Sequence, residues 1–166
     1  MSSDMNISNP GGKTTDIGGI KFNEEDVLSK TVRKTSSKVN DKPLFEYTIQ
    51  TTFGTFTYDD NDVLNLKIDS NKQASIFKKD GKVIIDNCHL KEIKGTQKSD
   101  TYVVSDSSVY GLDVQGDPQN QDTIILTGQS NLTRKRTDNN DVITDLTTWH
   151  TDGTMEMEPL HFNIKM

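Results

Sequence analysis

The side chains that could do chemistry are few in this chain of 166 residues. It contains one cysteine, Cys88, and three histidines. Cys88 and His89 are adjacent, so on a strand they point to opposite faces and share neither a proton nor a metal ion. We interpret His150, which lies beside the Asp152-Gly153 turn, and His161 as solvent-exposed residues. No nucleophile elbow, phosphate loop or H-E-x-x-H motif is present. The sequence therefore predicts no catalytic residue, no metal site and no cofactor.

Aspartates precede several of the expected strands, at Asp60, Asp62, Asp100, Asp122 and Asp141. Calcium needs six to eight oxygen ligands that converge on one point, whereas one aspartate at each strand start supplies one ligand per turn. Asp side chains often accept hydrogen bonds from nearby backbone amides and so close turns. We interpret these aspartates as turn residues.

The overall composition limits the class of protein. The net charge is −6, and the densest cluster of cations is Arg134-Lys135-Arg136, so we do not expect a nucleic-acid partner. Hydrophobic residues make up 31% of the chain, which favours a thin assembly of sheets with much solvated surface. No apolar run approaches the ~18 residues that span a bilayer. We expect either a cytosolic protein or one from which a leader or anchor was removed.

Alternating apolar and polar residues predict an all-β protein. Phe45–Phe53 alternates with period 2, and Asp80-Gly81 separates two apolar-alternating segments as the turn of a two-residue hairpin. Thr137–Asn140 is a longer polar loop. Short connections favour antiparallel neighbours. We predict about eleven strands in an antiparallel meander over residues 44–166, folded as an open β-jelly-roll or trough of two sheets. Residues 1–43 are predicted to be a flexible segment with one short strand.

A two-strand unit recurs along the chain. Asp69, Asp106 and Asp145 stand 37 and 39 residues apart, which indicates a repeat of one β-hairpin with its connections. The alternative fold is a parallel solenoid. The recurring unit favours it, whereas the Asp-Gly hairpins and the lack of a glycine-rich nonapeptide argue against it.

Three stretches carry a resemblance to a known family. Thr101–Asp106, Asp122–Arg134 and Asp141–Phe162 read TYVVSD, DTIILTGQSNLTR and DVITDLTTWHTDGTMEMEPLHF. With these stretches, residues 43–164 resemble the periplasmic lipopolysaccharide-transport proteins of the OstA-like group, LptC more than LptA. The resemblance implies a non-enzymatic module that carries the acyl chains of lipopolysaccharide (lipid A) between two sheets of an open jelly-roll.

The same resemblance implies partners and a location. Open sheet edges are expected to pair with an LptA-like bridge, with the permeases of an ABC transporter, or with another copy of the chain as a homo-oligomer. The expected location is the periplasm, with an inner-membrane anchor in the full-length protein that is absent from this chain. Arg134 and Arg136, at a strand end, are expected to meet the phosphates of the lipid headgroup.

The lipid groove is expected to be lined by apolar residues on inward strand faces. These residues are Leu64, Leu66, Ile68, Ile76, Val83, Ile85, Val104, Tyr110, Ile124, Leu126, Ile143 and Trp149. The alternative is that they fill a closed core. Two other functions remain open: a carbohydrate-binding or carbohydrate-degrading all-β domain, for which one Trp and four Tyr offer few aromatic platforms, and a secreted β-solenoid adhesin or toxin fragment.

Overall fold

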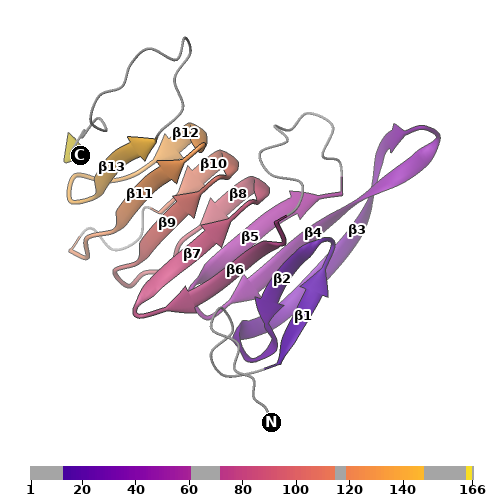
Figure 1. The fold of residues 1–166 in the computed structure, drawn as a ribbon, viewed down its shortest axis with the longest axis horizontal. Coiled ribbons are helices and arrows are strands. Elements are labelled where there is room, and N and C mark those ends of the chain that lie inside the picture. Colours follow the sequence, from indigo (N-terminus) through magenta and orange to yellow (C-terminus); the bar gives the residue numbers. More distant parts are fainter. Residues whose placement is uncertain (1–12, 61–71, 115–118, 148–163, 166) are drawn as a thin grey trace.

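The computed structural model describes residues 13–60, 72–114, 119–147 and 164–165, which form two β-sheets (Figure 1). Sheet A contains, in spatial order, β1 (Thr14–Ile17), β2 (Ile20–Asn23), β6 (Ala74–Lys79), β7 (Lys82–Asp86), β9 (Thr101–Ser105), β11 (Thr123–Gly128), β13 (Val142–Thr147) and β14 (Ile164–Lys165). Sheet B contains β12 (Asn131–Arg136), β10 (Ser108–Asp113), β8 (His89–Lys94), β5 (Gly54–Asp59), β4 (Lys42–Thr51) and β3 (Val27–Val39). The predicted all-β class is confirmed for the described residues.

Helical structure in the described residues is limited to one short 3-10 turn, η1 (Glu24–Asp26). Among these residues, no helix is long and apolar enough to cross a membrane.

The second half of the structure is a β-solenoid. The chain passes from β7 to β8, from β9 to β10 and from β11 to β12, each time from sheet A to sheet B, and successive coils stack in parallel. Paired residues are 19 to 23 positions apart, as in Val83 with Tyr102 and Ser108 with Asn131. The coil is therefore about half as long as the repeat inferred from the marker aspartates. Asp145 pairs with Leu126, so it is not equivalent to Asp106.

The predicted antiparallel meander is wrong for this half of the molecule. A short connection imposes antiparallel pairing only when both strands join the same sheet. Here each short connection turns a corner between the two sheets, so the next strand pairs with the preceding coil instead. The stacked strands appear side by side in Figure 1.

The first half is mostly antiparallel, as the sequence predicts, although β2 and β6 pair in parallel. β6 and β7 form the expected hairpin, with positive φ angles of 53° at Asp80 and 79° at Gly81. β3, β4, β5 and β8 are successive antiparallel neighbours in sheet B. This antiparallel part closes one end of the solenoid.

The predicted flexible segment 1–43 contributes three strands, β1, β2 and β3, where the sequence predicts one. β1 and β2 are anchored because Ile17, Ile20 and Phe22 are buried in the core, and β3 is held by its pairing with β4. The Tyr58 hydroxyl also donates a hydrogen bond of 2.6 Å to the Ile17 carbonyl. A few apolar residues in a polar segment are thus enough to bind it to the sheets.

Apolar side chains of both sheets meet in one core. Among the described residues, its largest fully buried members are Tyr58, Tyr102, Phe22, Phe53 and Phe56. Each buried tyrosine hydroxyl has a carbonyl acceptor; that of Tyr102 donates to Phe53 at 3.0 Å. Such hydrogen bonds remove the cost of burying a hydroxyl in an apolar core.

Candidate functional site

The predicted lipid-groove residues that the structure describes lie in the closed core, with one exception. Ile76, Val83, Ile85, Val104, Ile124, Leu126 and Ile143 are buried and belong to one packed cluster. Leu64, Leu66, Ile68 and Trp149 lie outside the described residues. The arrangement matches the alternative that these side chains fill a core.

Tyr110 is the exception, and the expectation that it faces inward is wrong. Its side chain is 54% exposed on the outer face of sheet B. In β10 the buried residues are Val109 and Leu112, so two residues, Tyr110 and Gly111, separate them where strict alternation allows one. Tyr110 follows the buried Val109 and so points outward, and the additional residue Gly111 returns Leu112 to the core.

A groove of about 620 Å³ lies on this outer face, lined by residues of β4, β5, β8, β10 and β12. The strand register places Gly111 between Glu92 of β8 and Arg134 of β12. Because Gly111 has no side chain, the floor of the groove is low at this point, with Tyr110 beside it. The groove therefore combines a hollow, an exposed aromatic ring and charges of both signs.

One wall of the groove is fixed by ion pairs. The Lys91 ammonium donates to Glu46 at 2.9 Å and contacts Asp59 at 3.2 Å, and Arg33 contacts Glu46 at 2.8 Å. The hydrogen bonds from Arg33 and Lys91 lower the pKa of Glu46 below its usual value. The bond from Glu46 raises the pKa of Lys91. This wall therefore presents an ionised carboxylate at neutral pH.

The opposite wall is cationic. Arg134, Lys135 and Arg136 of β12 line it, and all three are exposed. Lys135 pairs with Leu112, which pairs in turn with Ile93 of β8. β12 therefore has a charged residue at the position where β10 and β8 have apolar ones. The sequence interpretation of this triplet as a solvated strand end agrees with its exposure.

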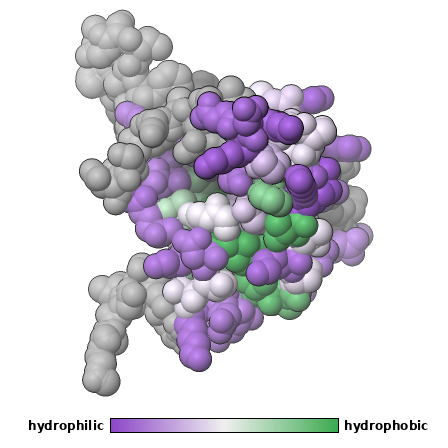
Figure 2. All heavy atoms as spheres, turned by 90° about the vertical axis from the view of Figure 1, so that its right-hand side faces the viewer, coloured by the Kyte–Doolittle hydropathy of each residue, from purple (hydrophilic) through white to green (hydrophobic). Residues whose placement is uncertain are grey.

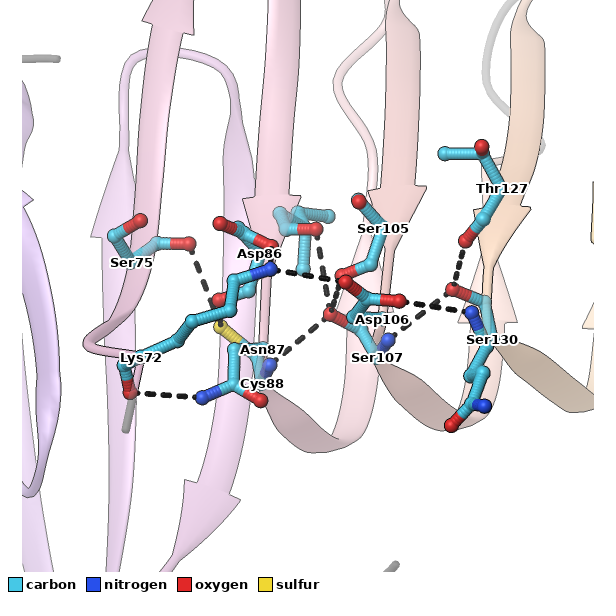
Figure 3. Close-up of polar contacts among 12 residues, drawn as sticks. Lys72, Ser75, Asp86, Asn87, Cys88, Ser105, Asp106, Ser107, Thr127 and Ser130 are labelled. Carbon is cyan, nitrogen blue, oxygen red and sulfur yellow. Dashed lines mark hydrogen bonds and ion pairs between the residues drawn. The ribbon is translucent and has the colours of Figure 1, made fainter. Parts of the chain in front are cut away.

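Two series of hydrogen bonds link successive coils, and we call each series a ladder. The first ladder is formed by small polar side chains at the corner where the chain leaves sheet A (Figure 3). The Ser107 hydroxyl accepts from the Cys88 amide at 3.0 Å and lies 2.7 Å from the Ser105 carbonyl. Ser130 repeats the arrangement one coil later: its hydroxyl accepts from the Ser107 amide at 3.1 Å and donates toward the Thr127 carbonyl at 2.6 Å. Backbone groups at this corner are thus satisfied without water.

An ion-paired cluster covers the same corner on its outer side. Lys72 reaches Asp86 at 3.0 Å and Asp106 at 2.9 Å, and Asp106 also accepts from the Gln129 amide at 2.8 Å. The amide bond and then Lys72 lower the pKa of Asp106. Gly128 is required here because its φ is +67° and a Cβ would overlap the Asp106 carboxylate.

The second ladder is formed by buried aspartates at the corner where each coil enters sheet A. Asp122 accepts from the Asp100 amide at 2.9 Å, and Asp141 accepts from the Asp122 amide at 3.0 Å. Asp100 and Asp141 also accept from amides of their own loops, as the turn interpretation predicts; the donors are Thr96 and Asp138. The links between coils were not predicted.

This carboxylate ladder perturbs one acid strongly. Burial raises the pKa of Asp122 to about 7, and the carboxylates of Asp141 and Asp100 add to the rise, while the Asp100 amide opposes it. No group of three or more metal-ligating side chains converges anywhere in the described part of the chain. We assign the ladder a structural role because its carboxylates accept hydrogen bonds from the amides of neighbouring coils.

Cys88 and His89 have different hydrogen-bond partners. The Cys88 thiol is buried and lies within hydrogen-bond distance of the Ser75 and Asp86 carbonyls, while the His89 ring contacts the Ser108 hydroxyl at 2.8 Å. Burial raises the pKa of the Cys88 thiol, which makes it a poor nucleophile.

Comparisons with models of protein families, with curated proteins and with solved structures found no match to this chain. The resemblance to the lipopolysaccharide-transport group therefore stays a prediction, and the geometry of the described residues carries the functional argument.

Proposed function

We propose that this chain is a non-enzymatic binding module whose outer groove on sheet B takes an extended, acidic carbohydrate. The observation that carries the proposal is the exposed ring of Tyr110 beside the hollow at Gly111, on a face that is otherwise polar. Exposed aromatic rings stack on the apolar faces of sugar rings, and the neighbouring polar groups bind the hydroxyls.

The dimensions of the groove suit a polymer better than a small molecule. From β4 to β12 it crosses five neighbouring strands of sheet B. Strands lie about 4.8 Å apart, so these five span about 19 Å, which is long enough for several sugar units.

The cations of β12 favour an acidic polymer, on a groove whose lining also includes Glu92 and Asp113. Arg134 stands beside the hollow at Gly111, and Lys135 continues the cationic wall. A guanidinium binds a carboxylate or a sulfate through two parallel hydrogen bonds. At the other wall, Glu46 is already paired with Arg33 and Lys91, so it adds little repulsion.

Glu46, on the same wall, is unsuited to act as the acid of a glycosidase. A glycosidase needs a carboxylic acid whose pKa is raised so that it holds a proton at working pH. Glu46 has the opposite perturbation, because the hydrogen bonds from Arg33 and Lys91 lower its pKa.

Lipid carriage remains a second prediction, with a periplasmic location and with transport modules as partners. It requires an open trough in which acyl chains lie between the sheets. The described inward residues instead pack on one another, and Ile76, Ile85 and Ile124 are fully buried. Acyl chains would have to separate these contacts, so the groove on the outer face supports carbohydrate binding better.

The test is calorimetric titration with oligosaccharides that contain uronic acid or sulfate groups, and with neutral oligosaccharides of the same length. We expect saturable binding of the acidic set. Tyr110→Ala should abolish it and Arg134→Ala should weaken it, whereas Lys38→Ala, at a distant exposed hairpin tip, should leave it unchanged. Equal binding of neutral and acidic sugars would refute the acidic specificity. Binding that survives Tyr110→Ala would refute the site.

A further inference from the structure

The β3–β4 hairpin extends beyond the sheet that should cover its inner face. Sheet A ends at β1 and β2, whose turn at Gly18 lies directly against the Tyr47 ring. In the register of the hairpin, Val32 pairs with Tyr47 and Lys34 with Phe45. Val32 and Phe45 therefore continue the core-facing side past the last strand of sheet A, and within the described residues no strand of sheet A covers them.

Exposed apolar side chains gather on this hairpin. Leu28, Val32 and Phe45 are 64%, 48% and 36% exposed, and they are three of the four large hydrophobic residues that are exposed in the described structure. Figure 2 shows a hydrophobic area bordered by hydrophilic side chains on this side of the molecule. Monomeric proteins seldom leave such side chains together in water without a binding role.

Cations surround the same area. Alternation along β3 places Lys30 and Lys34 on the face of Val32. Residues 27–47 contain five cations and two carboxylates in a chain of net charge −6, and one of those carboxylates, Glu46, is held by Arg33 and Lys91. Positive charge is thus concentrated at one end of an acidic protein.

We propose that the inner face of the β3–β4 hairpin binds an anionic lipid surface. Val32 and Phe45 would enter the boundary between headgroups and acyl chains, while Lys30 and Lys34 would meet lipid phosphates. This inference does not depend on the carbohydrate groove, which lies on the opposite face of sheet B.

The charges on β3 favour lipid over a strand-adding partner or a second copy. Lysines on an edge strand oppose the addition of another strand, and an antiparallel β3–β3 contact would bring like charges together. A lipid surface needs no backbone pairing and takes both the apolar side chains and the ammonium groups.

The test is co-sedimentation of the full chain with vesicles of phosphatidylcholine alone and of phosphatidylcholine mixed with phosphatidylglycerol. We expect binding to the mixed vesicles only, weakened by salt. Each lysine removed should lower the partition coefficient about fivefold. Lys30→Glu with Lys34→Glu should therefore abolish binding. Val32→Ser with Phe45→Ser should weaken it at every salt concentration.

A matched control places the same charge change elsewhere. Lys79→Glu with Lys82→Glu alters two exposed lysines at the β6–β7 turn and should leave vesicle binding unchanged. Circular dichroism confirms that each variant is folded. The proposal is overturned if the native chain does not bind the mixed vesicles, or if Lys79→Glu with Lys82→Glu lowers binding as much as Lys30→Glu with Lys34→Glu does. It is also overturned if Lys30→Glu with Lys34→Glu instead changes the oligomeric state.

Discussion

The two faces of sheet B differ in what they offer a ligand, and β10 carries both. Its inner residues, Val109 and Leu112, are buried in the core, while Tyr110 is exposed and Gly111 forms the floor of a charged groove. At β10 the inner face is apolar and filled, whereas the outer face is polar and hollowed. The inner residues of β10 stabilise the fold, and our proposal assigns ligand binding to the outer face.

The largest expected effect tests the two faces on one strand. Leu112→Ala should lower the free energy of unfolding by about 2–5 kcal/mol, because it removes buried side-chain contacts and leaves a cavity. Tyr110→Ala should change it by less than about 1 kcal/mol, since most of that ring is in water. Urea unfolding measures both. Equal losses would mean that the faces are not distinct.

The corner ladder should give the next effect. Ser107→Ala should cost about 1–3 kcal/mol, because the buried Cys88 amide loses its acceptor. Cys88→Ser is the matched control and should be close to neutral, because serine already occupies this place in the next two coils. If Ser107→Ala had no effect on urea unfolding, the ladder would not hold the coils together.

The aspartate ladder predicts a pH effect on stability. The pKa of an aspartate in an unfolded chain is about 4, whereas the pKa of Asp122 in the folded protein is about 7. Between these values the folded state binds more protons than the unfolded state, so stability should fall as pH rises from about 4 to about 7 and then level off for this group. Unfolding midpoints measured across this range check the sign.

Asp122→Asn isolates that contribution. It removes the titrating acid but keeps an oxygen that can accept from the Asp100 amide. The downward slope should shrink, whereas Asp41→Asn, in an exposed turn, should retain the native slope. An unchanged slope in Asp122→Asn would assign the pH dependence to another group.

The smallest effect should come from the ion pairs of the outer wall. Lys91→Ala should cost no more than about 1 kcal/mol, because its side chain is half exposed and its pairs with Glu46 and Asp59 are solvated. Added salt should reduce the difference between the variant and the native chain. A larger loss of unfolding free energy that did not depend on salt would mean that Lys91 stabilises the sheet by more than solvated ion pairs.

Local patterns predicted the antiparallel half well. The Asp80-Gly81 turn depends on neighbouring residues and appears as predicted. The alternation predicted for Phe45–Phe53 holds only in part: Ile49 and Thr51 are buried in β4, whereas Phe45 is exposed and Phe53 lies in the turn after Thr51. The direction of pairing in the other half depends on where the chain goes after each corner. Asn87 and Asp106 turn these corners with positive φ, and in the sequence they look like ordinary turn residues.

A signal for the solenoid was nevertheless present. Cys88, Ser107 and Ser130, like Asp100, Asp122 and Asp141, recur at the 19- to 23-residue spacing of the coils. The aspartates were predicted to be turn residues, each in its own turn, and their common spacing was not recognised. The groove was missed for a different reason: Tyr110 was predicted to face inward with the apolar residues, and the residue types do not show that Val109 and Leu112 face the core instead.

The most direct test of binding on the outer face is mapping by nuclear magnetic resonance. The backbone amides are followed while an acidic oligosaccharide is added, and then while a lipid with free acyl chains is added. Our account predicts saturable shifts from the sugar at Glu92, Tyr110 and Gly111, with the amides of Ile85, Val104 and Leu126 unmoved by either ligand. Shifts at these three inward residues with the lipid, and none in the groove with the sugar, would contradict it and favour lipid carriage between the sheets.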